Sequence, residues 1–214
     1  SKGGDYFPQT ELNEIINLEE GFQLKAEGLD LKSKLVVNAT GAWANDVLKK
    51  LDTSISLCYN QGTIIVQEAL SSRGLQLLEM PGNGQAYIVH EGRAWLGTTS
   101  KDLEDPSQVG PEEGAEEVLK MKLAKIIPGV VDRKVDAAFS GVRPLYAGEE
   151  EEGRELSRDF QVIEEPNGVF TVVGGKLTTA RLMAEKVVDK ICVRLDCSIT
   201  CVTHKELLPR LDDE

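Results

Sequence analysis

The feature that most constrains the fold of this chain lies near its end, where an apolar run meets a glycine pair. Val172-Val173 leads into Gly174-Gly175-Lys176-Leu177-Thr178-Thr179, and helical spacing follows to about Leu195. This pattern predicts a strand, a corner and a helix. Glycines at the corner let the backbone approach a ligand, and the first helical turn offers N–H groups to an electron-rich group. A P-loop is excluded, because Leu177 stands where serine or threonine must follow the lysine.

Composition limits the class of partner. The chain has 214 residues, 41% hydrophobic and 28% charged, which is typical of one or two soluble globular domains. Its formal net charge of -12 argues against a nucleic-acid partner or an anionic membrane surface. No apolar stretch approaches the roughly 20 residues of a membrane span. An anionic substrate would therefore need a local basic cluster.

No metal site is expected from the cysteines or from the acidic run. Cys192, Cys197 and Cys201 follow a C-x4-C-x3-C spacing, which differs from zinc and ferredoxin spacings. Reduced thiols are favoured, and a terminal disulfide or a redox tail are the alternatives. The run Glu149–Glu152 is interpreted as a solvated loop tip.

Hydrophobic periodicity predicts alternating short strands and a few helices. The run from Lys34 to Ala39 is continuous, so we expect it to be buried on both faces. In the following helix we expect Trp43 to be a core residue, and Glu91-Gly92 and Gly82-Asn83-Gly84 to be hairpin turns. Strands are predicted over residues 12–18, 21–26, 34–38, 63–67, 75–79, 86–90, 93–98, 135–142, 159–164 and 169–173, and helices over 41–51, 111–127 (beginning at Pro111) and 177–195.

Several motifs, taken together and in order, resemble the FAD-dependent glycerol-3-phosphate dehydrogenases. They are Val36-Val37-Asn38-Ala39-Thr40-Gly41-Ala42-Trp43, Leu96-Gly97-Thr98-Thr99-Ser100, Ser140-Gly141-Val142-Arg143-Pro144-Leu145, Leu156-Ser157-Arg158-Asp159 and the glycine-pair segment. The resemblance runs from about Lys32 to about Cys201. Thr98-Thr99-Ser100 and the tail residues Cys192, Leu195 and Cys201 are closest to the catalytic subunit of the anaerobic enzymes.

The resemblance implies a DAO-type flavoprotein of the α+β or α/β class. A sheet-based substrate-binding cap (51–153) would be flanked by pieces of a Rossmann-like FAD-binding domain (1–50 and 154–195), followed by a tail (196–214). The Gly-x-Gly-x-x-Gly run that opens such a domain is absent from the sequence. We therefore expect the later part of a longer enzyme, which alone would be inactive and would not hold FAD.

The resemblance also assigns roles to individual residues. Arg143 and Arg158 would bind the substrate phosphate; a surface ion pair is the alternative for each. Lys176 would stabilise an alkoxide forming on the substrate, or would bind the phosphate or a flavin carbonyl, or would simply be solvated. The residues expected to contact FAD are Thr40, Gly41, Ala42, Gly174, Gly175, Leu177 and Thr178.

Two departures from the family pattern bear on substrate choice. Ala180 stands where a tyrosine commonly follows the two threonines, and Gln61-Gly62-Thr63-Ile64 stands where the family has Lys-Gly-Ser/Thr, often followed by His. The missing positive charge could alter which anion is preferred. No residue is assigned as the general base.

The leading hypothesis is therefore part of an enzyme that oxidises sn-glycerol 3-phosphate to dihydroxyacetone phosphate by hydride transfer to flavin. One alternative is an FAD-dependent oxidase of a 2-hydroxy acid or an amino acid. Another is a non-catalytic module that binds a phosphorylated ligand or a partner. We expect electron-transfer partner subunits, self-association through exposed edges, and a cytoplasmic location, at the inner membrane face where partner subunits provide the attachment.

Overall fold

The computed structural model describes residues 3–80, 83–148 and 159–205. They form two compact units. Unit 1 is assembled from the two ends of the chain (1–56 and 146–214), and unit 2 is continuous (57–145). The predicted substrate ligand Arg158 and the acidic run Glu149–Glu152 lie outside the described residues.

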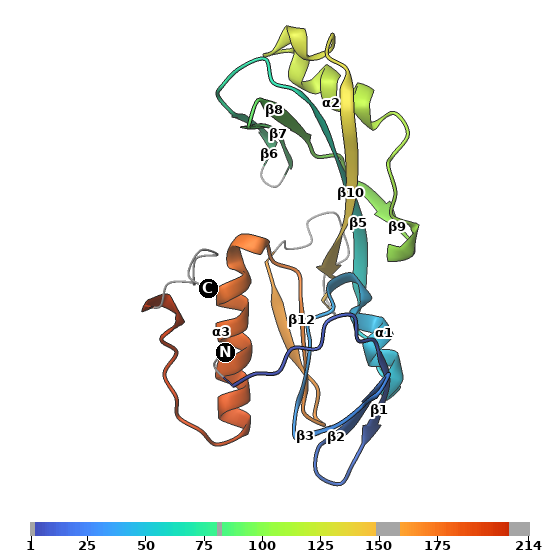
Figure 1. The fold of residues 1–214 in the computed structure, drawn as a ribbon, viewed down its shortest axis with the longest axis vertical. Coiled ribbons are helices and arrows are strands. Elements are labelled where there is room, and N and C mark those ends of the chain that lie inside the picture. Colours follow the sequence, from blue (N-terminus) through green and yellow to red (C-terminus); the bar gives the residue numbers. More distant parts are fainter. Residues whose placement is uncertain (1–2, 81–82, 149–158, 206–214) are drawn as a thin grey trace. The chain divides into compact units, whose positions relative to one another are not determined.

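Unit 1 contains two three-stranded sheets and the longest helix. In the first sheet each strand pairs antiparallel with the next; in the second the order is β11-β12-β4, with β12 antiparallel to β11 and parallel to β4. Figure 1 shows α3 running along β12. The elements are β1 (Leu12–Asn17), β2 (Phe22–Ala26), β3 (Leu29–Ser33), β4 (Val36–Asn38), η1 (Gly41–Trp43), α1 (Ala44–Leu48), η2 (Lys49–Leu51), β11 (Gln161–Glu164), β12 (Val169–Val173), η5 (Leu177–Thr179), α3 (Ala180–Arg194) and η6 (Thr203–Lys205).

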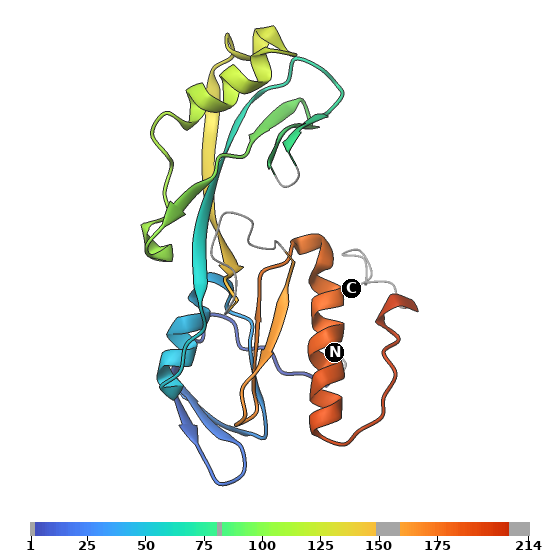
Figure 2. The ribbon, with the colours of Figure 1, turned by 180° about the vertical axis from the view of Figure 1, so that it is seen from behind.

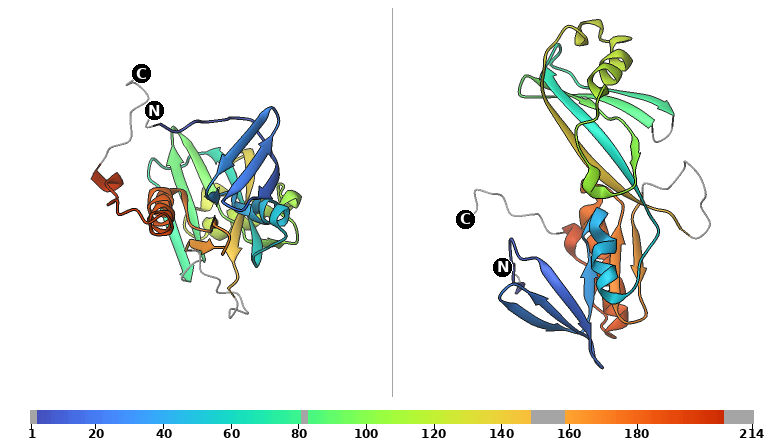
Figure 3. Two further views of the ribbon diagram at one scale, coloured as in Figure 1. Left: turned by 90° about the horizontal axis from the view of Figure 1, so that it is seen from below. Right: turned by 90° about the vertical axis from the view of Figure 1, so that its right-hand side faces the viewer.

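The mainly apolar sequence of β12, Val169-Phe170-Thr171-Val172-Val173, has a direct cause, because its apolar side chains alternate between two hydrophobic clusters. Val169 packs with Phe22, Val36 and Leu48 on the side of α1, and the neighbouring Phe170 packs with Val187 of α3. Figure 3 shows the sheet of β1, β2 and β3 lying beside α1. Strand β12 is therefore the central strand of unit 1, buried on both faces.

Unit 2 is a six-stranded sheet covered on one face by α2. The order is β10-β5-β8-β7-β6, with β9 paired to β5, and the described pairs of this sheet are antiparallel. In Figure 2, which views the molecule from behind, α2 lies across these strands. The elements are β5 (Leu57–Glu68), β6 (Leu75–Met80), β7 (Asn83–His90), β8 (Arg93–Gly97), β9 (Lys101–Leu103), η3 (Pro106–Gln108), α2 (Ala115–Ala124), η4 (Pro128–Val130) and β10 (Val135–Tyr146).

The core of unit 2 lies between the sheet and α2. Leu119 and Leu123, four residues apart on one face of the helix, are fully buried against sheet side chains that include Ile65, Tyr87 and Leu96. The opposite face of the sheet carries the partly exposed aromatic rings of Trp95 and Phe139, which stack with centroids 5.8 Å apart. One face of the sheet thus forms the core, and the other carries partly exposed side chains.

The sequence predicted most elements correctly, but three expectations were wrong. Trp43 is 50% exposed rather than in the core. The run Lys34–Ala39 is not buried on both faces: in β4 the burial alternates, and Val37 is 44% exposed. Helix α2 begins at Ala115 rather than Pro111, after Gly114 with φ 77°.

The predicted hairpin turn at Glu91-Gly92 is confirmed. Both residues have positive φ (49° and 74°), as a type I′ turn requires, and they join the paired residues His90 and Arg93. Around Gly82-Asn83-Gly84, β6 and β7 form an antiparallel pair, while residues 81–82 lie outside the described residues. Within the part of the chain that the structure describes, no helix combines the length and the apolar character that crossing a bilayer would require.

Candidate functional site

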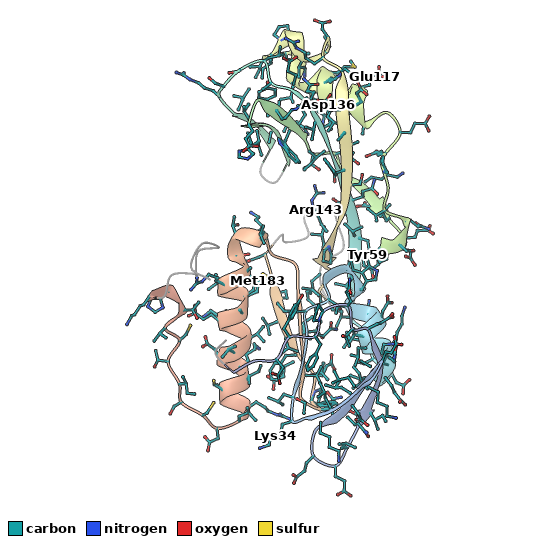
Figure 4. All side chains as sticks on the ribbon, in the orientation of Figure 1. Lys34, Tyr59, Glu117, Asp136, Arg143 and Met183 are labelled. Atoms are coloured by element: carbon teal, nitrogen blue, oxygen red, sulfur yellow. The ribbon has the colours of Figure 1, made fainter. Side chains whose placement is uncertain are left out.

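Arg143 of β10 is held by side chains from two other segments of unit 2. Its NH1 donates to Oδ1 of Asn60 at 2.7 Å, and its NH2 donates to Oγ1 of Thr98 at 2.7 Å. Figure 4 shows Arg143 on β10. A guanidinium fixed at two nitrogen atoms has lost much of its rotational freedom, and a preorganised planar fork is suited to bind a phosphate or a carboxylate.

Gly62 makes room for this guanidinium. A Cβ atom on Gly62 would lie 2.0 Å from NH2 of Arg143 and 2.4 Å from Oγ1 of Thr98. The guanidinium therefore lies directly over the backbone of β5. Any residue other than glycine would displace it.

Hydroxyl groups form hydrogen bonds between neighbouring segments of the chain near this site. The hydroxyls of Thr63 on β5 and Ser140 on β10 are 2.9 Å apart, and the backbone N–H of Thr63 donates to Oγ1 of Thr99 at 3.0 Å. Thr63 is 1% exposed. These bonds join β5 to β10, which carries Arg143, and to the segment that carries Thr98.

Gln61, the residue that departs from the family pattern, faces away from Arg143. Successive side chains of a strand point to opposite faces, and Gly62 occupies the Arg143 face. The Gln61 side chain is 2% exposed, and its Oε1 accepts a hydrogen bond from the N–H of Gly110 at 3.1 Å. The glutamine therefore contributes to the structure rather than to the charge around the guanidinium.

In unit 1 the sheet brings two predicted glycine corners to one edge. The parallel strands β4 and β12 pair Asn38 with Thr171, and Gly41 and Gly174 each follow three residues later. Both glycines have positive φ, 61° and 78°. The segments Thr40–Ala42 and Gly174–Thr178 therefore leave the same end of two adjacent strands, which is where parallel sheets commonly bind ligands.

The buried side chain of Asn38, which is 2% exposed, stabilises the β4 corner through hydrogen bonds. Its Nδ2 donates to the carbonyl of Ala44 at 3.0 Å, and its Oδ1 accepts from Oγ1 of Thr40 at 2.6 Å. A Cβ on Gly41 would meet no atom within 4 Å, so space is open above the turn, whereas Ala42 is buried. The sequence patterns marked this corner but gave no role to Asn38.

The β12 corner places polar and apolar groups at the surface. Lys176 and Thr178 are exposed, and Leu177 is 94% exposed. The Thr179 hydroxyl accepts from the N–H of Lys176 at 3.0 Å, which fixes the start of η5. Gly175 lies against Met183 of α3, labelled in Figure 4. The corner therefore combines a rigid backbone with a large apolar side chain that no part of the described chain covers.

The glycine at position 174 makes a testable contribution to stability. A Cβ there would lie 2.6 Å from the carbonyl oxygen of Asp159, in addition to the strain of φ 78°. We expect Gly174→Ala to cost about 2 kcal/mol or more in free energy of unfolding. Gly28→Ala is the matched control, because Gly28 has φ 71° with no atom within 4 Å of its Cβ position. Gly28→Ala should lower the free energy of unfolding, measured by urea denaturation, by about 1 kcal/mol. An equal loss for the two variants would contradict the close contact at Gly174.

The thiol of Cys192 at the end of α3 is kept in its protonated form. A hydrogen bond with Cys197 is the main cause that raises the pKa of Cys192. The backbone N–H of Cys197 also donates to the carbonyl of Cys192 at 2.9 Å. Because the thiolate is the reactive form, this thiol is poorly suited to be a nucleophile.

Comparison with known proteins identifies the family. The model of the FAD-dependent oxidoreductases, known as DAO, matches residues 1–190. This chain belongs to that family. Among relatives, the A1 subunit of the anaerobic glycerol-3-phosphate dehydrogenase of Haloferax volcanii is 31% identical over 194 residues, which are 86% of this chain and 33% of that protein. The corresponding subunit of the Escherichia coli K12 enzyme is 28% identical over 197 residues, 87% of this chain and 36% of that protein. The chain thus spans about a third of the length of these curated relatives.

Solved structures show the same fold. The glycerol-3-phosphate dehydrogenase of Bacillus halodurans, in complex with FAD, superposes with a TM-score of 0.71 at 20% identity, covering 91% of this chain and 40% of that one. Glycine oxidase from Geobacillus kaustophilus gives 0.63 at 20% identity, with 89% and 49% coverage. The predicted DAO-type fold and the resemblance to the dehydrogenases are therefore confirmed.

The residues present in unit 1 fit FAD, the cofactor of this family. Two positive-φ glycine corners meet at one sheet edge, and open space lies over Gly41. Beside them Leu177 is almost fully exposed, which is unfavourable in water unless an apolar surface covers it. FAD combines an aromatic flavin ring with a diphosphate, so it would use both the apolar and the N–H-rich parts of this edge.

Sequence reasoning missed the residues that position Arg143. Thr98 and Gly62 lay in the motifs Leu96–Ser100 and Gln61–Ile64 but had no assigned role, and Asn60 was not singled out. The period of two along β5 is the signal that relates Asn60 to Gly62. The motif residues divide between the two units: the residues predicted to contact FAD belong to unit 1 and Arg143 belongs to unit 2.

Proposed function

We propose that the protein carrying this chain oxidises sn-glycerol 3-phosphate to dihydroxyacetone phosphate. The fixed guanidinium of Arg143, over Gly62 and between Asn60 and Thr98, is the observation that carries this proposal. The names of relatives that are 28–31% identical support the phosphorylated substrate. On this proposal unit 2 is the substrate-binding cap and unit 1 is part of the FAD-binding domain.

Each proposed ligand has a distinct task. Arg143, together with Arg158, binds the phosphate and so holds the secondary alcohol in one orientation. Lys176 places a positive charge where the alcohol oxygen gains negative charge as its carbon loses hydride. Thr40, Gly41, Ala42, Gly174, Gly175, Leu177 and Thr178 hold FAD. When bound, FAD accepts the hydride, that is, the hydrogen of the C–H bond with its electron pair; the hydroxyl proton leaves to a base or to water.

The electrons must then leave the protein. Relatives are named as single subunits of an anaerobic dehydrogenase, which supports a partner subunit in the role of electron acceptor. In the proposed arrangement the assembly works in the cytoplasm, at the inner face of the membrane where its partner is attached. Exposed apolar side chains of unit 1, including Val37 and Trp43, are candidates for burial by further protein.

The test is anaerobic reduction of the full-length protein that carries this chain. Addition of sn-glycerol 3-phosphate should bleach the yellow flavin band, and glycerol at the same concentration should act far more slowly because it lacks the anion. Bound flavin that stays oxidised with sn-glycerol 3-phosphate but bleaches with a 2-hydroxy acid or an amino acid would replace this proposal by the oxidase alternative. A full-length protein without flavin would point to the binding module.

A further inference from the structure

Asn60 is the centre of a polar cluster that extends from Arg143 to Ser100 and Asp102. It lies on β5 directly opposite Asp102 of β9, and it is 8% exposed. Its Oδ1 accepts from NH1 of Arg143 at 2.7 Å, while its Nδ2 donates to Oδ1 of Asp102 at 2.8 Å. The Ser100 hydroxyl is within hydrogen-bond distance of both ends of the amide, at 3.0 Å and 3.2 Å.

The chemistry of the two neighbours determines the orientation of this amide. A guanidinium has only donors, so the carbonyl oxygen of Asn60 must face Arg143. The carboxylate of Asp102 has only acceptors when ionised, so the NH₂ group must face Asp102. Both requirements are met by one orientation of asparagine. Neither aspartate nor leucine at position 60 could accept from Arg143 and donate to Asp102 at the same time.

The interposed amide also changes the charge that an incoming anion meets. Asn60 and Thr98, which each accept a hydrogen bond from the Arg143 guanidinium, are uncharged side chains. A carboxylate in direct contact would neutralise the guanidinium and compete with an anionic substrate for it. Asp102 instead acts on the amide, one hydrogen bond farther away.

We propose that Asn60 is a positioning residue for anion binding, oriented by Asp102 so that it fixes Arg143 without neutralising it. The inference rests on the proposed role of Arg143 as the ligand of the substrate phosphate, and it adds a specificity for anions to that site. Asp102 is an exposed acidic side chain, and its negative charge alone would weaken the binding of phosphate. On this proposal its carboxylate instead strengthens the binding of phosphate, because it orients Asn60.

The decisive experiment compares Asp102→Ala with Asp102→Asn in the full-length flavoprotein. Alanine removes the acceptor for the Asn60 amide, so KM for sn-glycerol 3-phosphate should rise about threefold to tenfold with kcat little changed. Asparagine keeps a carbonyl acceptor at the same place, so it should restore KM to near the wild-type value. If Asp102 acted only through its negative charge, both variants would lower KM alike, and that result would overturn the proposal.

A second substitution tests the neutrality of Asn60. Asn60→Asp should raise KM for sn-glycerol 3-phosphate and weaken inorganic phosphate binding, measured by titration calorimetry, each by about tenfold or more. The rate with glycerol, which has no charge, should fall by a clearly smaller factor than the rate with sn-glycerol 3-phosphate. Ser72→Asp is the matched control, since it adds the same charge in the exposed loop after the other end of β5.

The calorimetric titration separates a failure of this inference from a failure of the proposed function. A wild-type protein that binds phosphate but is not reduced by sn-glycerol 3-phosphate would refute the proposed reaction alone, and the ranking of the Asp102 and Asn60 variants for phosphate would still apply. Wild-type protein that does not bind phosphate would refute the positioning role. The positioning role would also be refuted if Asn60→Asp lowered the rates with glycerol and with sn-glycerol 3-phosphate by the same factor, because a general structural fault would then explain the effect.

Discussion

Replacing Arg143 by alanine in the full-length protein is expected to lower kcat/KM for sn-glycerol 3-phosphate by about a hundredfold to a thousandfold. Hydrogen bonds to charged groups contribute about 1.5–3 kcal/mol each, and a guanidinium can donate two of them to one phosphate. Loss of about 3–4 kcal/mol corresponds to that factor. The measurement is the anaerobic rate of flavin reduction over a range of substrate concentrations.

The matched control for this substitution is Arg133→Ala. Arg133 belongs to the same unit, is exposed, and forms an ion pair with Glu68 at 2.9 Å. Exposed pairs of this kind contribute little, so kcat/KM should stay within about twofold. Arg143→Lys should give an intermediate value, because it keeps the charge and loses the planar fork. Arg143→Ala protein with normal kinetics would remove Arg143 from the substrate site.

A large loss of stability in unit 2 is expected for Leu119→Ala. The Leu119 side chain is fully buried between α2 and the sheet, in the cluster with Ile65, Tyr87 and Leu123. Truncation of a buried leucine to alanine costs about 2–5 kcal/mol, because it removes apolar contacts and leaves a cavity. Since Arg143 is carried by the same unit, its position depends on this core.

Urea denaturation of the 214-residue chain in a Trp43→Phe background would measure this loss. The chain has two tryptophans, so Trp95 then reports on unit 2 alone. Met121→Ala is the control, because Met121 lies on the same helix and is 61% exposed. It should change the free energy of unfolding by no more than about 0.5 kcal/mol. If both variants shift the midpoint equally, packing of α2 on the sheet is not what stabilises unit 2.

The sequence predicted elements best where a single physical signal dominates. Strand β12 was predicted over Val169–Val173, and the structure buries it on both faces. For β4, the rule that a continuous apolar run is buried on both faces failed, because such a run does not reveal what covers each face. The exposure of Val37 and of Trp43 was missed for this reason. The predicted start of α2 was wrong because Pro111 and the following glutamates are residue types typical of a helix start. In the structure the helix begins after Gly114.

The same limit applies to the site. The motifs singled out Arg143 and both glycine corners, because the resemblance to the family and the specific chemistry of arginine and glycine pointed to them. They gave no reason to single out Asn60 or Asn38, since one asparagine resembles another until its neighbours are known. Asn60 acquires its role from Asp102, which only strand pairing brings opposite to it. Positioning residues of this kind are defined by contacts between segments and therefore emerge with the fold.

The parallel pairing of β4 with β12 also dictates an order of events during protein synthesis. Strand β4 emerges from the ribosome before unit 2, yet its neighbour β12 follows only after the whole of unit 2. Unit 2 is continuous in sequence and contains its own core, so it can fold while β12 is still being made. Unit 1 must wait with the apolar residues of β4 unpaired, and its closure is a late, long-range step. Strand β4, which leads into a corner of the proposed flavin site, is therefore exposed to misfolding or to chaperones in the nascent chain.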